Sequence, residues 1–236
     1  MAADRLGRRA RSTRSAIACL TTWAALASCD APAAIHEDPA YDPTQLSGGL
    51  VYHWALGKTI DLYADATGEP AGFDIQSAVR DGAALWSPFA YYREFAFHLV
   101  NDPAAADIII HYKQAPRIVD VMGCEPPGSG AGLTVFCADQ PHAAVLPLLA
   151  GGGGHVKMDI YLDPLRVSDA VLAQYHLTRQ QAFVTLAAHE LGHALGIAAH
   201  SDEVTDVMHT LAISPPSSRD AATLRSVLHR KADVRL

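Results

Sequence analysis

The sequence has no stretch of about 20 consecutive apolar residues, which is the length that a permanent transmembrane helix requires. It also has no internal repeat, no collagen-like glycine period and no sustained heptad pattern, which excludes repeat arrays, collagen and coiled coils. Charged residues make up only 18% of the chain, whereas 50% is hydrophobic. A chain of 236 residues with this composition is globular, with one large domain or two small ones.

The first 28 residues have the layout of an export signal. Five arginines between positions 5 and 14 precede an uncharged, mostly apolar stretch from Ala16 to Ala27. The residues Leu26-Ala27-Ser28-Cys29 then resemble the lipobox of bacterial lipoproteins, in which the cysteine becomes the lipidated first residue of the mature chain. We therefore expect a signal peptide over 1–28, lipid on Cys29, and export to the cell envelope. A plain cleaved signal, which would give a secreted protein, and an uncleaved anchor are the alternatives.

Basic residues become scarce once this signal is removed. The segment carries five Arg and one Asp, so the rest of the chain keeps 13 basic and 24 acidic residues, a net charge of −11. Binding to phosphate backbones needs a basic surface, so a nucleic-acid partner is excluded. Membrane attachment is expected through the lipidated N-terminus alone, and we assume a monomer.

Cysteine is scarce too. Of four cysteines, Cys19 leaves with the signal and Cys29 would carry lipid, so only Cys124 and Cys137 remain. In the oxidising compartment of an exported protein this pair most simply forms one disulfide, with two buried free thiols as the alternative. A two-cysteine metal site is disfavoured because no nearby Cys or His has ligand spacing.

Beyond residue 50 the apolar pattern predicts a sheet with one helix. Strands are expected at 58–65, 94–100, 106–112, 133–138 and 155–163, and a helix at 73–86. The preceding residues, 29–50, are rich in Pro, Asp and Ala without periodicity, which is typical of a linker. Trp86 and the aromatic run from Phe89 to Tyr92 are expected to pack in the core behind the sheet.

A second helix is predicted to begin after Thr178, which forms a capping-box pattern with Gln181, and to end near Gly196. It contains the motif His189-Glu190-Leu191-Gly192-His193. Residues four apart on a helix share one face, so both imidazoles can bind one zinc ion, while the glutamate contacts its bound water. Zinc lowers the pKa of that water toward 7, and Glu190 can take its proton and pass it to a leaving amine.

This part of the sequence resembles the metzincin metalloproteases. Their motif reads HExxHxxGxxH, in which the glycine turns the chain so that a third histidine reaches the zinc. A methionine further along forms a tight turn beneath the metal. His189, Glu190, His193 and Gly196 match this pattern, and Met208 is the candidate for the Met-turn.

The third histidine departs from the family pattern by one position. Ala199 stands where the family places its ligand, and His200 follows it. Because the extra residue falls after the glycine, outside the helix, a loop can absorb it without moving the first two ligands. We take His200 as the third ligand. The alternatives are that Asp202 or His209 replaces it, or that His200 is a surface residue.

Other segments resemble the matrixin branch of the family in the same order over residues 54 to 230. These are the helix at 73–86, the strands ADIIIHY, AGLTVFCADQP and HVKMDIYLD, and the C-terminal helix in SSRDAATLRSVLH. The resemblance implies an α+β metzincin-like domain over 51–236, with a twisted, mostly parallel sheet, an antiparallel edge strand, an active-site helix and a C-terminal helix. An extended peptide would pair with the edge near 133–139, and a Cys124–Cys137 link would brace that rim.

Some family features are missing. No cysteine-switch propeptide is visible, and Thr210 stands where astacins have a tyrosine. Matrixins also bind structural calcium and a second zinc. Here the scattered candidates are expected to be solvated loop and strand residues rather than ligands: Asp139, His142, His155 and Asp163.

The sequence therefore predicts an exported zinc metalloendopeptidase that holds one catalytic Zn²⁺ and acts on a peptide or protein. A surface module that uses zinc for stability and cleaves nothing is the main alternative, because the displaced third histidine leaves room for it. A metal-dependent hydrolase of another substrate class is less favoured, because an edge strand suits an extended peptide.

Overall fold

The computed structural model describes residues 38–112, 132–135 and 158–236. Within these residues no helix is long and apolar enough to cross a bilayer. The predicted signal, Cys29 and the Cys124–Cys137 pair lie outside the described residues.

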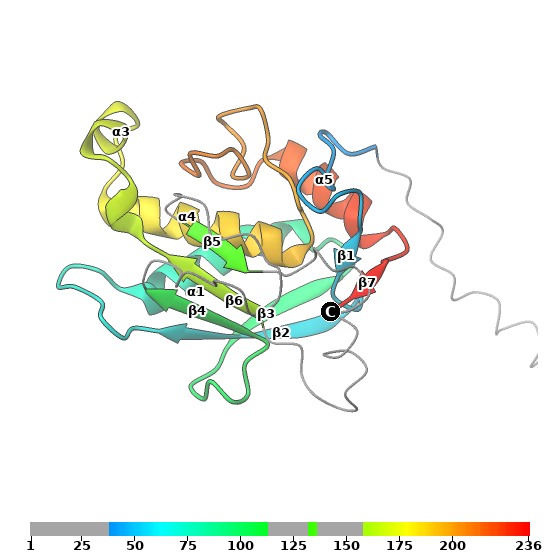
Figure 1. Cartoon of the computed structure of the whole chain (residues 1–236), viewed down its shortest axis with the longest axis horizontal. Coiled ribbons are helices and arrows are strands. Elements are labelled where there is room, and N and C mark those ends of the chain that lie inside the picture. The colour runs from blue at the N-terminus through cyan, green and yellow to red at the C-terminus, as the bar shows by residue number, and fades with distance from the viewer. Residues whose placement is uncertain (1–37, 113–131, 136–157) are drawn as a thin grey trace, which may run out of the picture. The chain divides into compact units, whose positions relative to one another are not determined.

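A five-stranded sheet in the order β3-β2-β4-β6-β5 forms the body of the fold (Figure 1). Its strands are β2 (Lys58–Asp65), β3 (Phe95–Leu99), β4 (Ile108–Tyr112), β5 (Gly132–Val135) and β6 (Met158–Leu162). Strands β2, β3, β4 and β6 pair in parallel, and only the edge strand β5 is antiparallel to its neighbour β6. The prediction of an α+β fold with a mostly parallel sheet and an antiparallel edge is confirmed at this level.

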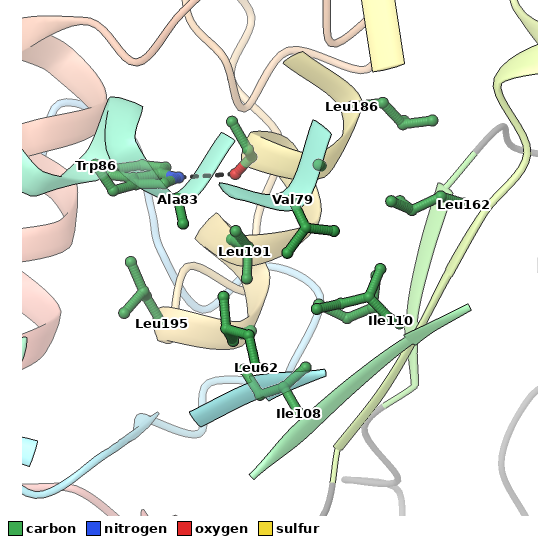
Figure 2. Packing of buried hydrophobic residues seen from close by; sticks show 14 of the residues in the cluster. Leu62, Val79, Ala83, Trp86, Ile108, Ile110, Leu162, Leu186, Leu191 and Leu195 are labelled. Carbon is green, nitrogen blue, oxygen red and sulfur yellow. Dashed lines mark hydrogen bonds between the residues drawn. The ribbon is translucent and has the colours of Figure 1, made fainter. Parts of the chain in front are cut away.

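Each central strand buries alternate residues on one face of the sheet, as a period of two requires. Ile60 and Leu62 of β2, Ile108 and Ile110 of β4 and Leu162 of β6 are at most 1% exposed. Helices α1 (Ile75–Trp86) and α4 (Arg179–Leu195) cover this face, and their apolar side chains meet those of the strands in a single cluster (Figure 2). The buried face of the sheet thus packs against α4 and fixes its position.

The helices begin where side chains can bond to free backbone N–H groups. The Asp74 carboxylate caps α1 through Ser77, and Ser217 forms a capping box with Asp220 at the start of α5 (Ser218–Leu228). A short helix α3 (Asp169–Gln174) and two 3₁₀ turns, η1 (Ser87–Phe89) and η2 (Pro164–Arg166), complete the helical elements of the described residues. The sequence pattern did not indicate these three short elements.

A separate parallel pair joins the two ends of the domain. Strand β1 (Tyr52–His53) pairs with β7 (Val234–Arg235). The described end of the predicted linker also makes contacts, because the Leu46 N–H donates to the carbonyl of Ala198 over 2.7 Å. In Figure 1 this segment, in blue, runs beside α5. The segment before residue 51, predicted to be a linker, therefore already contacts the domain at Leu46, before β1 begins.

The prediction that the whole aromatic run packs in the core is wrong for two of its members. Trp86 is fully buried and contacts Phe89 edge to face, but Tyr91 and Tyr92 are 60% and 68% exposed. A turn at Arg93, which has a φ of 58°, joins these two tyrosines to β3 and leaves both rings at the surface. The guanidinium of Arg225 packs over the ring of Tyr91.

Candidate metal centre

Helix α4 carries the predicted motif and forms for local reasons. Thr178 and Gln181 make the capping box reciprocally, and the helix ends at Gly196 with a φ of 121°. A Cβ on Gly196 would lie 2.4 Å from the carbonyl oxygen of Tyr52, so only glycine fits this turn. The prediction of a helix between Thr178 and Gly196 is confirmed.

Three histidines converge where the helix ends. His189 and His193 come from α4, one turn apart, and His200 returns to them after the bend at Gly196. One nitrogen from each imidazole lies within 4.8 Å of the other two, and the Nε2 atoms of His189 and His193 are 3.1 Å apart. Tetrahedral zinc with bonds of 2.0 to 2.1 Å would separate its ligand nitrogens by about 3.3 Å. The group could therefore hold a metal ion.

Two of the rings are oriented by backbone carbonyls. The Nδ1 of His189 lies 2.7 Å from the carbonyl oxygen of Val207, and the Nδ1 of His193 lies 2.7 Å from that of Ile197. A carbonyl can only accept, so each Nδ1 carries the proton and each Nε2 keeps its lone pair. The Nε2 atoms of His189 and His193 are thus both available as donors to one metal ion.

The surroundings also keep the rings uncharged. Burial, and then the neighbouring His193, hold the pKa of His189 well below its usual range. Burial and the proximity of His200 lower the pKa of His193 to about 4. Burial and His209 lower the pKa of His200. Neutral imidazoles are the form that binds metal, so this cluster is in the ligand state at neutral pH.

The one-residue displacement of the third ligand is absorbed by the loop. His200 stacks on His189 with ring centroids 5.3 Å apart, while Ala199 is buried. Neither substitute ligand joins the group. The carboxylate of Asp202 is largely exposed and lies 2.9 Å from the guanidinium of Arg219, and the Nδ1 of His209 accepts the backbone N–H of Leu211.

Met208 lies directly against the helix. It is fully buried, and a Cβ built on Gly192 would be 2.4 Å from its sulfur and 2.8 Å from the ring of Trp86. The glycine inside the histidine motif therefore lets the loop from Ser201 to His209, hereafter the Met208 loop, approach the helix. The loop closes on itself through the Ser201 N–H and the Met208 carbonyl, 2.9 Å apart.

Two buried carboxylates hold the Met208 loop, and the sequence analysis missed both. Asp220 at the start of α5 accepts the N–H of Val207 over 2.8 Å, and its other oxygen lies 3.4 Å from the nitrogen of Met208. Asp206 accepts the Ser217 hydroxyl over 2.6 Å and pairs with Arg219. Burial raises the pKa of Asp220. No local pattern in the sequence indicated the bonds of Asp220 to the loop.

Three aromatic side chains fix α4 from its flanks and were missed as well. The indole N–H groups of Trp86 and Trp54 donate to the carbonyls of Ala188 and Ala194, each over 2.8 Å. The Trp86 bond is drawn in Figure 2. The hydroxyl of Tyr52 donates to the carbonyl of His193 over 2.8 Å. The helix is thus held at three points along the metal-facing stretch.

Glu190 lies between the two helical histidines in sequence and is 3% exposed. Burial, and then the charge of Glu190, raise the pKa of the Tyr52 hydroxyl. Of the candidates for structural metals, Asp139, His142 and His155 lie outside the described residues, and Asp163 pairs with Arg166 over 3.3 Å.

No protein-family model and no curated protein matches this chain.

Proposed function

We propose that this protein is a zinc-dependent endopeptidase with a metzincin-like, matrixin-type catalytic domain. The observation that carries the proposal is the convergence of His189, His193 and His200 beside a buried Glu190. Three neutral nitrogen donors are the ligand set of open, catalytic zinc sites, whereas structural sites use four protein ligands. The resemblance of the histidine motif and of the order of elements supports the family assignment.

The chain's own residues divide the chemistry between them. When bound, zinc would lower the pKa of a coordinated water and polarise the substrate carbonyl. The three imidazoles would hold the ion, and Glu190 would be the general base and acid that takes up a proton from the attacking water and gives it to the leaving amine. Val207 and Ile197 keep the imidazoles in the binding tautomer through their carbonyls.

The edge of the sheet supplies a place for an extended substrate. In the sheet of the described residues, β5 is an edge strand, it is antiparallel to β6, and it lies next to α4. A peptide paired with the side of β5 away from β6 would run past the metal centre through main-chain hydrogen bonds. This arrangement supports a peptide or protein as the substrate.

The proposal includes export, because the arginine-rich start and the apolar stretch that follows have the layout of a signal. Lipidation at Cys29 would tether the domain to the cell envelope, and without it the enzyme would be secreted. One disulfide between Cys124 and Cys137 also belongs to this proposal.

The test compares the wild-type protein with Glu190→Gln. Metal content by mass spectrometry and cleavage of a mixed peptide library, with and without a chelator, are measured on both. We expect one zinc per chain in each protein, chelator-sensitive cleavage by the wild type, and at least about 100-fold slower cleavage by the variant, because its amide cannot accept a proton. Asp81→Asn makes the same carboxylate-to-amide change at an exposed position of α1, away from the histidines, and is the matched control that should keep full activity.

Full activity in Glu190→Gln would remove this residue from the mechanism. One zinc with no cleavage of any peptide by the wild type would favour the zinc-stabilised binding module instead.

A further inference from the structure

The chain just before the domain contacts two of the segments that support the metal ligands. We call residues 40–47 the N-terminal strap. Its Leu46 N–H donates to the carbonyl of Ala198, two residues before His200, over 2.7 Å. Its Ala40 N–H lies 3.2 Å from the hydroxyl of Thr223 on α5. The strap therefore bridges the turn that carries the third histidine and the helix that holds the Met208 loop.

The most specific contact of the strap is made by Tyr41. Its ring packs against the main hydrophobic cluster, and its hydroxyl donates to Oδ1 of Asp220 over 2.7 Å. A hydrogen bond from a neutral donor to a buried carboxylate is short and strong compared with one between neutral groups. Burial and the negative charge of Asp220 raise the pKa of Tyr41, which keeps the phenol protonated as the donor.

Asp220 depends on this bond because its two oxygens have different partners. Oδ2 accepts the N–H groups of Val207 and Ser217 over 2.8 and 2.9 Å. The short contact of Oδ1 is the Tyr41 hydroxyl, since the nitrogen of Met208 is 3.4 Å away. Without the phenol, Oδ1 keeps only that long contact, and the carboxylate can rotate away from the Val207 N–H.

The backbone of Val207 passes this effect to the metal centre. Its N–H bonds to Asp220, and its carbonyl, in the next peptide unit, accepts the Nδ1–H of His189 over 2.7 Å. A shift of this residue therefore moves the acceptor that orients the His189 imidazole. Partners of this kind, one step beyond the ligands, typically change metal affinity by about 10- to 100-fold when removed.

We propose that Tyr41 is a positioning residue of the metal centre, acting through Asp220 and the backbone of Val207 on His189. This inference rests on the proposed metal-binding function and adds to it a segment that lies only 12 residues beyond the predicted lipid-bearing Cys29. The strap would then join the anchored end of the chain to the metal ligands.

The experiment uses the full chain with Tyr41→Phe, which removes one oxygen atom and keeps the ring. Tyr92→Phe removes the same atom from a tyrosine that is 68% exposed, and serves as the matched control. Zinc affinity is measured by competition with a chelator, ligand geometry by the visible absorption of bound Co²⁺, and peptide cleavage by kcat and KM. Circular dichroism and the thermal unfolding midpoint of the metal-free proteins check folding.

For Tyr41→Phe we expect about 3- to 10-fold weaker zinc binding, because the bond lies one step further out than a direct partner of a ligand. We also expect an altered Co²⁺ spectrum and a lower kcat with unchanged KM, because the strap is placed to act on the ligands and not on the peptide. Tyr92→Phe should match the wild type in every measurement.

Wild-type zinc affinity and an unchanged Co²⁺ spectrum in Tyr41→Phe would overturn the proposal, even if the thermal midpoint fell, since that result describes a structural role only. A wild-type protein that binds zinc but cleaves nothing would overturn the proposed protease activity and leave the Tyr41 measurements decisive. A wild-type protein that binds no zinc would overturn both.

Discussion

Gly192 offers the sharpest test of how the metal centre is packed. On helix propensity alone, Gly192→Ala inside α4 should stabilise the protein by about 1 kcal/mol, because alanine loses less backbone entropy than glycine. The structure predicts the opposite sign. The added Cβ would lie 2.4 Å from the sulfur of Met208 and 2.8 Å from the ring of Trp86, both far inside normal contact distance.

Both neighbours resist displacement. Trp86 is fixed by its bond to the Ala188 carbonyl, and the Met208 side chain, although flexible, is fully buried, so its sulfur can move only by displacing other core atoms. Overpacking of this kind costs about 1–3 kcal/mol, and we take the upper end because both neighbours are held. After the propensity gain of about 1 kcal/mol, the net loss is about 2 kcal/mol. For a domain of this size that loss corresponds to a Tm lower by roughly 4–8 °C.

The assay is thermal unfolding followed by circular dichroism with a chelator present, so that metal binding does not contribute to the midpoint. The same change is made in a Met208→Ala background, where the space left by the sulfur should reduce the cost of Gly192→Ala to about 1 kcal/mol or less. A higher Tm for Gly192→Ala, or an equal cost in both backgrounds, would refute the packing argument.

Two further predictions concern the turn after α4 and the charge of the ligands. Gly196→Ala should lower the unfolding free energy by about 3 kcal/mol or more and so lower the urea midpoint. The reason is that the position combines a left-handed φ of 121° with a distance of 2.4 Å from the added Cβ to a backbone carbonyl oxygen. A urea midpoint within error of wild type would contradict this prediction. In chelated protein, the unfolding free energy should fall by about 2 kcal/mol between pH 7 and pH 5 for each metal-site histidine that stays neutral when folded. The reason is that the unfolded chain takes up a proton on each such histidine below about pH 6.5 and the folded chain does not. Urea titrations at pH 7, 6 and 5 check this, and His193→Gln should flatten the curve; equal stability at all three values would show that the imidazoles are not held neutral.

The elements that the sequence predicted correctly are those whose cause is local. The capping pair at Thr178 and Gln181, the four-residue spacing of His189 and His193, and the glycine at the helix end all act within a few turns of one helix. The strands of the sheet were predicted within a few residues because each alternates buried and exposed positions by itself. Short elements such as β1 and β7 were missed, because two residues carry no period.

Sequence spacing could not determine which residue joins His189 and His193 as the third candidate ligand. The sequence left His200, Asp202 and His209 as candidates, because the chain leaves the helix at Gly196 and no period applies beyond it. The structure brings His200 to the other two imidazoles, while Asp202 is drawn to Arg219 on another helix. The choice among them thus depends on contacts that lie outside the motif.

By itself, the sequence determined the helix with the histidine motif, the residues it carries and the class of fold around it, because hydrogen-bonding caps and apolar periodicity act between near neighbours. The tertiary structure alone decided which groups support the ligands. Tyr41 meets Asp220 across 179 positions, and Trp54 meets α4 across 140. Contacts of that range arise only when the sheet and helices close around a common core, and no local pattern records them.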